Sequence, residues 1–220
     1  MRYTTVLWDL DGTILDSGAG VFDCFRRTFA ALGVEQPTDE TLRTFVGPPL
    51  RTTFEQMMGF APELANRALE TYRDFYHSGA ALNADLYEGV VDVIAQTHAA
   101  GIATSLATSK ALAGTVVVGE HFGFIQHFDF LGTADPAQNR HSKADVVAFA
   151  IHGLKQLGAN CERVLLVGDR IHDVEGARAH GIDVALVTWG YGNPDEWAQA
   201  DYIVDSAESL NKLILGNGAQ

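Results

Sequence analysis

Short apolar runs alternate with longer segments of helical spacing along most of the chain. The apolar runs are rich in β-branched and aliphatic side chains, which is typical of strands buried on both faces of a sheet. They occupy residues 4–8, 102–107, 129–131, 164–167, 184–187 and 202–204. The helical segments occupy residues 90–99, 111–121, 143–157, 173–180 and 206–215. This alternation predicts an α/β fold in which helices cover a parallel sheet.

A segment near the N-terminus interrupts the alternation. From about residue 16 to residue 84 there is no convincing strand, but apolar side chains such as Val21 and Phe25 recur at helical spacing. A single crossover helix between parallel strands would need far fewer residues. We therefore expect an α-helical cap at residues 16–84, inserted into an α/β core formed by residues 1–15 and 85–220.

Composition and charge limit the expected partners. At 220 residues the chain is long enough for one large domain or a core with an insertion. Its net charge is −13 and no local basic patch stands out, so we do not expect it to bind a nucleic-acid polymer. The two cysteines, Cys24 and Cys161, are too few for a disulfide framework. Charged residues precede any long apolar stretch, so we expect no signal peptide, no membrane span and a cytoplasmic location.

Polar side chains gather where the predicted strands end. The first strand is followed by Asp9 and Asp11, which a strand would place on the same side. Further polar residues follow later strands or open helices: Thr108, Ser109, Lys110, Lys143, Asp169 and Asp173. Open parallel sheets bind ligands beyond the carboxyl ends of their strands, so we expect these side chains to meet. Because clustered carboxylates repel one another without a cation, the set predicts bound Mg²⁺, and the hydroxyl and ammonium groups suit a phosphoryl group.

Other known motifs that use acidic residues or glycines do not fit the sequence. Counted from Asp9, a calcium loop would need its glycine at the sixth position, whereas Gly12 is at the fourth. No P-loop and no G-x-G-x-x-G sequence follows a predicted strand. Nucleotide-binding folds of those types are therefore unsupported.

Four motifs, in chain order, resemble those of the haloacid dehalogenase superfamily of hydrolases. They are Asp9-x-Asp11-Gly12-Thr13, Thr108, Lys143 and Gly168-Asp169-x-x-x-Asp173. The resemblance covers essentially the whole chain and implies a Rossmann-like core with a mobile cap, whose helical type is inserted where residues 16–84 lie. Asp16-Ser17 and the segment Val46-Gly47-Pro48-Pro49-Leu50 are most similar to the branch that holds phosphoglycolate phosphatases and nucleotidases.

The resemblance implies roles for the carboxylates. Asp9 would be the nucleophile that forms an aspartyl-phosphate, and Asp11 would act as general acid and base. Mg²⁺ would be held by a carboxylate oxygen of Asp9, the main-chain carbonyl of Asp11 and Asp169. Asp173 would orient the water ligands of the metal instead of binding it directly.

The resemblance also implies the residues that bind phosphate. Thr108 and the Ser109 amide would donate hydrogen bonds to the phosphoryl oxygens, although many relatives carry asparagine at the latter position. Lys143 would neutralise the charge of phosphate and of the nucleophile. Lys110 is the alternative phosphate lysine, because the motif fixes only the order of its residues in the chain.

The expected function is a Mg²⁺-dependent phosphatase that hydrolyses a small phosphorylated metabolite, as a phosphoglycolate phosphatase does. In the predicted cap, Gly47 and Arg51 would select the substrate, with Arg51 reaching a second anionic group. Lys143 lacks the flanking prolines usual in phosphoglycolate phosphatases proper, which keeps 5'-nucleotidases and pyrophosphatases as alternatives. A sugar-phosphate mutase shares the same residues and is also an alternative.

Two hypotheses from other classes are less favoured. A phosphoacceptor signalling domain would place an acidic pair after its first strand and the acceptor on a later one, whereas here the order is reversed and a cap intrudes. A catalytically silent binding relative is disfavoured by the complete motif set. The sequence leaves the choice between a monomer and a homodimer open.

Overall fold

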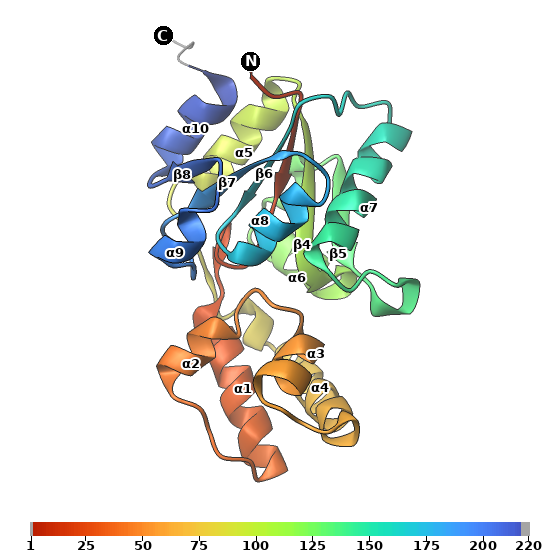
Figure 1. Cartoon of the computed structure of the whole chain (residues 1–220), viewed down its shortest axis with the longest axis vertical. Helices are drawn as coiled ribbons and strands as arrows, with labels where there is room; N and C mark the ends of the chain where they lie inside the picture. Colours follow the sequence, from red (N-terminus) through yellow and green to blue (C-terminus); the bar gives the residue numbers. More distant parts are fainter. Residues whose placement is uncertain (1, 217–220) are drawn as a thin grey trace.

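A six-stranded parallel sheet forms the centre of the protein, as the computed structural model of residues 2–216 shows (Figure 1). Its strand order is β5-β4-β1-β6-β7-β8. The strands are β1 (Thr5–Trp8), β4 (Ala103–Ala111), β5 (Phe130–Ala134), β6 (Val164–Gly168), β7 (Asp183–Val187) and β8 (Tyr202–Val204). The predicted α/β fold with a parallel-sheet core is therefore confirmed.

Helices cover both faces of the sheet (Figure 1). The helices of this part are α5 (Val90–Ala99), α6 (Leu112–His121), α7 (Lys143–Gln156), α8 (Ile171–Arg178), α9 (Pro194–Trp197) and α10 (Ala207–Leu215). Side chains alternate between the faces of a strand, so Val6 and Trp8 of β1 pack with α5 and α10, whereas Leu7 packs with α7 and α8. All three are fully buried, which explains why β1 is a continuous apolar run.

The position of β1 brings distant parts of the sequence together. It pairs in parallel with β4 on one side and with β6 on the other. Trp8 lies level with Leu106 and with Val167. The residues that follow β1, β4 and β6 consequently meet at one edge of the sheet.

A separate group of helices, called the helical lobe here, lies beyond that edge (Figure 1). It consists of α1 (Gly18–Leu32), α2 (Asp39–Thr44), α3 (Leu50–Thr52), the π-helical turn η1 (Thr53–Met57), α4 (Pro62–His77) and the 3₁₀ turn η2 (Ala80–Leu82). Its core is aromatic: the ring of Phe25 on α1 lies 4.9 Å from that of Tyr72 on α4 and 5.7 Å from that of Phe54. Edge and tilted contacts of this kind add to the energy of apolar burial and join α1 to α4.

Two short strands connect the helical lobe to the sheet. β2 (Leu15–Asp16) leaves the sheet edge, β3 (Asp85–Leu86) returns to it, and the two pair antiparallel. The boundaries that the sequence predicts, after residues 15 and 84, lie at this ribbon.

Some element ends differ from the sequence prediction. β4 continues to Ala111 instead of ending at residue 107, because it keeps pairing with β5 through Thr108 and, after an irregularity, Ala111. α8 begins at Ile171, two residues before its predicted start. At the end of β4 the polar side chains of Thr108 to Lys110 hide regular backbone from a reading based on apolar spacing.

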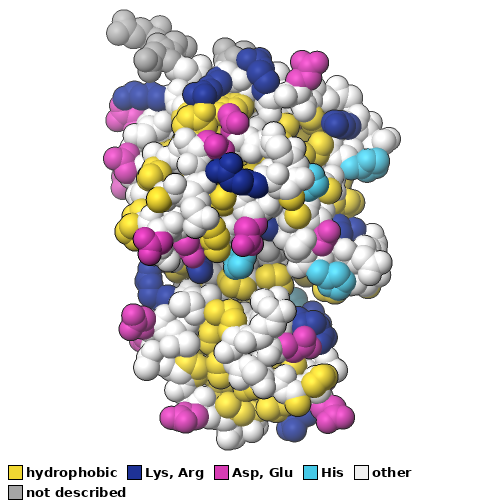
Figure 2. Space-filling model, viewed as in Figure 1, with side chains coloured by type: hydrophobic (Ala, Val, Ile, Leu, Met, Phe, Trp, Pro, Cys, Tyr) yellow, Lys and Arg dark blue, Asp and Glu magenta, His cyan; other side chains and the backbone are white. Residues whose placement is uncertain are grey.

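The surface carries charged side chains of both signs (Figure 2). Acidic and basic side chains are interspersed over the face drawn in Figure 2. Among residues 2–216, no helix combines the length and apolar character needed to cross a membrane.

Candidate active site

Lys143 joins two of the predicted carboxylates. Its ammonium Nζ lies 2.8 Å from Oδ1 of Asp9 and 2.8 Å from Oδ1 of Asp173, and it donates a hydrogen bond to the carbonyl of Ala107 at 3.0 Å. The Lys143 side chain is 4% exposed. The predicted phosphate lysine therefore lies directly against the predicted nucleophile.

Local sequence places this lysine at the first turn of α7. Ser142 caps the helix: its hydroxyl accepts from the Asp145 N–H, while the Asp145 carboxylate accepts from the Ser142 N–H. Gly176 on α8 leaves room for the lysine, since a Cβ there would lie 2.5 Å from Cγ of Lys143. The helix cap and the glycine together fix where the ammonium group lies.

Asp169 follows β6 and is fully buried. Its Oδ2 accepts a hydrogen bond from the main-chain N–H of Tyr191 at 2.7 Å. Its Oδ1 has no hydrogen-bond partner within the described residues 2–216. Since a buried oxygen without a partner is costly, this atom is suited to a ligand.

Asp173 has both carboxylate oxygens engaged. Oδ2 accepts from the main-chain N–H groups of Asp169 and Arg170, each at 3.1 Å, and Oδ1 contacts Lys143. The side chain is thus anchored at the start of α8 and supports the loop that carries Asp169.

Burial changes the ionisation of Asp9 and Asp169 in the cluster that these two carboxylates form with Asp173 and Lys143. It raises the pKa of Asp9 to about 7, with the Lys143 ammonium opposing the rise and Asp173 adding to it. Burial, followed by the charges of Asp173 and Asp9, raises the pKa of Asp169 well above its ordinary value. One lysine does not balance three carboxylates, so the cluster favours a further cation.

The arrangement fits a hard metal ion. Asp9, Asp169 and Asp173 each offer a carboxylate oxygen, and these atoms lie within 4.8 Å of one another. Asp173 is already committed to Lys143 and two amides, which leaves Asp9 and Asp169 as the carboxylates suited to hold Mg²⁺ through oxygen.

Gly12 allows the chain after β1 to pass close to Asp169. Its φ angle is 86°, a left-handed conformation that favours glycine. A Cβ at this position would lie 2.1 Å from Oδ2 of Asp169. The glycine of the first motif is therefore required by backbone conformation and by space.

Asp11 has a different cationic partner from Asp9. Nζ of Lys110 lies 2.9 Å from Oδ2 of Asp11 and donates to the hydroxyl of Tyr76, on α4 of the helical lobe, at 2.6 Å. Lys110, the alternative phosphate lysine, thus lies against Asp11, whereas Lys143 lies against Asp9.

A cavity of about 690 Å³ lies between the sheet edge and the helical lobe. Asp11 and Ser109 line it from the sheet, and Gly47 and Arg51 line it from the lobe. Thr108 is 1% exposed and is absent from the lining; its hydroxyl accepts a hydrogen bond from the main-chain N–H of Lys110.

Arg51 is already paired within the lobe. Its guanidinium contacts the carboxylate of Glu55 and donates to Oδ1 of Asn66 at 2.9 Å. An anionic substrate group would have to compete with these partners, a condition that the sequence does not reveal.

Residues outside the predicted set also support the site. Arg170 donates from Nη1 to the carbonyl of Val46 in the helical lobe at 2.8 Å, and its Nε lies 3.0 Å from Oε2 of Glu196. Tyr191 holds Asp169 through its main chain and donates from its hydroxyl to Asp16 at 2.6 Å. In the sequence, Arg170 directly follows the motif residue Asp169, and Tyr191 stands between Gly190 and Gly192, which are the only signals that could have suggested them.

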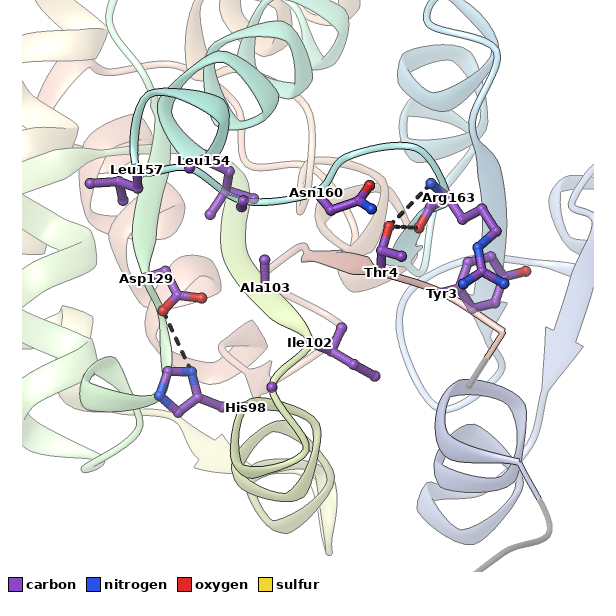
Figure 3. Close-up of a pocket in the computed structure, with 13 residues that line it drawn as sticks. Tyr3, Thr4, His98, Ile102, Ala103, Asp129, Leu154, Leu157, Asn160 and Arg163 are labelled. Atoms are coloured by element: carbon purple, nitrogen blue, oxygen red, sulfur yellow. Dashed lines mark hydrogen bonds and ion pairs between the residues drawn. The ribbon is translucent and has the colours of Figure 1, made fainter.

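A second cavity, of about 740 Å³, lies near the amino-terminal ends of the strands (Figure 3). Its lining includes Thr4, Ile102 and Asn160, with His98 3.7 Å from Asp129 at one side. Its lining contains none of the predicted site residues.

Buried carboxylates and a buried lysine at the carboxyl edge of a parallel sheet are typical of hydrolases with a Rossmann-like core, and comparisons with known proteins identify the family. The haloacid dehalogenase-like hydrolase family matches residues 6–187. The crystal structure of a predicted phosphatase from Clostridium acetobutylicum superposes with a TM-score of 0.89 at 30% identity, covering 98% of this chain and 99% of the other. The chain belongs to the haloacid dehalogenase-like hydrolases.

Two curated relatives carry different descriptions. The chain is 41% identical over 191 residues to the tyrosine-protein kinase PtkA of Mycobacterium tuberculosis. That match covers 86% of this chain and 64% of PtkA, so the chain spans under two thirds of that relative. It is 30% identical over 196 residues to a 5'-nucleotidase of Pseudomonas aeruginosa, covering 89% of this chain and 87% of the relative.

Proposed function

We propose that the protein is a Mg²⁺-dependent phosphatase that hydrolyses a small phosphomonoester through an aspartyl-phosphate on Asp9. The observation that supports this most is the pairing of the Asp9 carboxylate with Lys143, beside Oδ1 of Asp169, which has no hydrogen-bond partner within residues 2–216. The Lys143 cation stabilises the ionised, nucleophilic form of the buried Asp9 carboxylate, and Oδ1 of Asp169 is suited to bind a metal.

In this mechanism a carboxylate oxygen of Asp9 attacks phosphorus, and the bond from phosphorus to the ester oxygen breaks. Asp11 gives a proton to the leaving oxygen and then takes one from the water that attacks the phosphoenzyme. Breaking the bond between phosphorus and Asp9 releases inorganic phosphate and restores both carboxyl groups. Thr108 and the Ser109 amide would donate to the phosphoryl oxygens. Bound Mg²⁺ would supply positive charge beside them.

Access to Asp9 would depend on the helical lobe. Asp9 is 5% exposed, and the lobe lies over the carboxyl edge of the sheet. We expect the lobe to move away for substrate to enter, and its contacts to the sheet to exclude water when it returns. Gly47 and Arg51, which line the cavity from the lobe, would then contact the leaving group.

The preferred substrate is a phosphomonoester with a second anionic group, as in phosphoglycolate. The size of the cavity supports a second candidate. A volume of about 690 Å³ exceeds what a two-carbon acid would fill and suits a nucleoside monophosphate, the substrate class of the 5'-nucleotidase relative. The match to PtkA supports testing transfer of the phosphoryl group to a tyrosine hydroxyl as well.

The deciding experiment measures phosphate release from phosphoglycolate, nucleoside monophosphates, sugar phosphates, pyrophosphate and an aryl phosphate, with Mg²⁺ and with a chelator. Incubation with radiolabelled ATP and a tyrosine peptide tests transfer to tyrosine. We expect Mg²⁺-dependent release from at least one ester. No release from any compound, or equal release with chelator, would rule out the proposed function.

Replacing Gly12 tests the close approach of the first motif to Asp169. In Gly12→Ala, the new methyl group would displace the Asp169 carboxylate, and we expect turnover of an aryl phosphate to fall by about 10²-fold, the effect of misplacing a catalytic group by about 1 Å. Gly101→Ala is the matched control: Gly101 has φ 76°, and apart from its chain neighbours no atom of residues 2–216 lies within 4 Å of its Cβ position. Both variants should lose about 1–2 kcal/mol of unfolding free energy to the strained φ. Equal turnover in the two would contradict the steric role.

A further inference from the structure

Lys110 is buried at the boundary between the sheet and the helical lobe. Its side chain is 11% exposed, and its Nζ lies between Oδ2 of Asp11 and the hydroxyl of Tyr76. The ammonium group also lies 4.7 Å from the centre of the Tyr76 ring. A buried ammonium group is stable only when it is paired, so these two partners fix where it lies.

The two oxygens of the Asp11 carboxylate have different environments. Lys110 contacts Oδ2, whereas Oδ1 is buried and has no hydrogen-bond partner among the described residues. Asp11 lines the cavity between the sheet and the lobe. Lys110 therefore fixes the carboxylate through one oxygen, and the buried second oxygen is unpaired among the described residues.

The partners of Lys110 come from different parts of the fold. Lys110 lies near the end of β4, Asp11 lies in the loop after β1, and Tyr76 lies near the end of α4 in the helical lobe. Gly114 on α6 lies beside both side chains, and a Cβ there would be in ordinary van der Waals contact with them, 3.4 Å from Tyr76 and 3.6 Å from Lys110. The orientation of Asp11 is thus linked, through Lys110, to a side chain of the lobe.

From this chain of contacts we propose that Tyr76 and Lys110 are positioning residues, which orient Asp11 toward the leaving oxygen when the helical lobe lies against the sheet. The inference rests on the proposed function, in which Asp11 protonates the leaving group. It predicts that proton transfer depends on the lobe, because Tyr76 moves away from Lys110 whenever the lobe moves away from the sheet.

The test uses Tyr76→Phe, which removes the hydroxyl and keeps the ring, and compares kcat/KM for esters with different leaving groups. An alkyl alcohol needs a proton in order to leave, whereas an acidic phenol leaves without one. We expect kcat/KM to fall about tenfold on an alkyl phosphate, the effect of one hydrogen bond to a charged group, and less than about twofold on the phosphate of an acidic phenol. An equal loss on both esters would indicate a structural role and overturn the proposal.

A double-mutant cycle tests whether Tyr76 acts through Lys110. Lys110→Met should lower kcat/KM on the alkyl phosphate by about 10²-fold, within the range of general acid catalysis. Adding Tyr76→Phe to Lys110→Met should cause no further loss, because the bond that it removes is already absent. Losses that multiply independently would contradict the linkage. Tyr202→Phe, on β8 and outside the cavity lining, is the control that should leave every ester unaffected.

A measurement without substrate separates this proposal from the proposed function. In protein with ¹³C-labelled aspartate carboxyl groups, the Asp11 resonance is identified by its loss in Asp11→Asn. Tyr76→Phe should shift that resonance, and Tyr202→Phe should not. If the wild-type protein hydrolysed no ester, the proposed function would fail, whereas the resonance would still decide whether Tyr76 positions Asp11. An unmoved Asp11 resonance in Tyr76→Phe would overturn the positioning role.

Discussion

Asp9→Asn should abolish phosphate release from every ester that the wild-type protein hydrolyses. The amide keeps the size of the side chain but is a far weaker nucleophile, so the covalent step is lost. We expect a loss of at least about 10⁴-fold in kcat, in the range measured when a catalytic nucleophile is removed. The measurement is phosphate release at saturating substrate and Mg²⁺.

The fold should survive this change. Lys143 keeps Asp173 as a partner, and burial already disfavours the charge on Asp9. The matched control is Asp92→Asn, on the exposed side of α5, which should leave kcat unchanged. Near-normal turnover by Asp9→Asn would mean that another group attacks phosphorus.

Removing Lys143 should damage both stability and activity. Lys143→Met leaves the carboxylates of Asp9 and Asp173 buried without their shared cation. Leaving a buried charge unpaired costs about 3–5 kcal/mol of unfolding free energy. Loss of a donor to the phosphoryl oxygens should lower kcat by a further ~10²–10³-fold. Denaturant unfolding and aryl phosphate turnover measure the two effects.

A lysine from the same helix provides the control. Lys155 lies on the exposed side of α7, and Lys155→Met should change unfolding free energy and kcat very little. If Lys143→Met were as stable as Lys155→Met, the ion pairs at Lys143 would contribute nothing to folding. If it also kept full kcat, Lys143 would have no role in phosphate binding.

The sequence predicts the sheet well because burial on both faces leaves a direct signal. β1, whose side chains pack on helices from both sides, is a plain apolar run, and its polar ending marks the carboxyl edge. The carboxylates and Lys143 could be proposed from order alone, since parallel strands bring their ends together. The predicted end of β4 is less accurate, because the last part of this strand contains Thr108 to Lys110, whose side chains are polar.

The contacts between the helical lobe and the sheet could not be predicted in the same way. They join residues far apart in the chain, such as Tyr76 with Lys110 and Arg170 with Val46. No periodicity links such pairs, because each depends on the relative placement of two packed units. The sequence also suggests Arg51 as a free cation, whereas its side chain already has Glu55 and Asn66 as partners.

The most direct test of the account is to trap the phosphorylated carboxylate. Protein quenched in acid during turnover is reduced with borohydride, which converts an aspartyl-phosphate to homoserine, and the modified residue is located by mass spectrometry. The account predicts homoserine at position 9, only with a hydrolysed ester present, and none in Asp9→Asn. Rapid turnover with homoserine at another aspartate would contradict it.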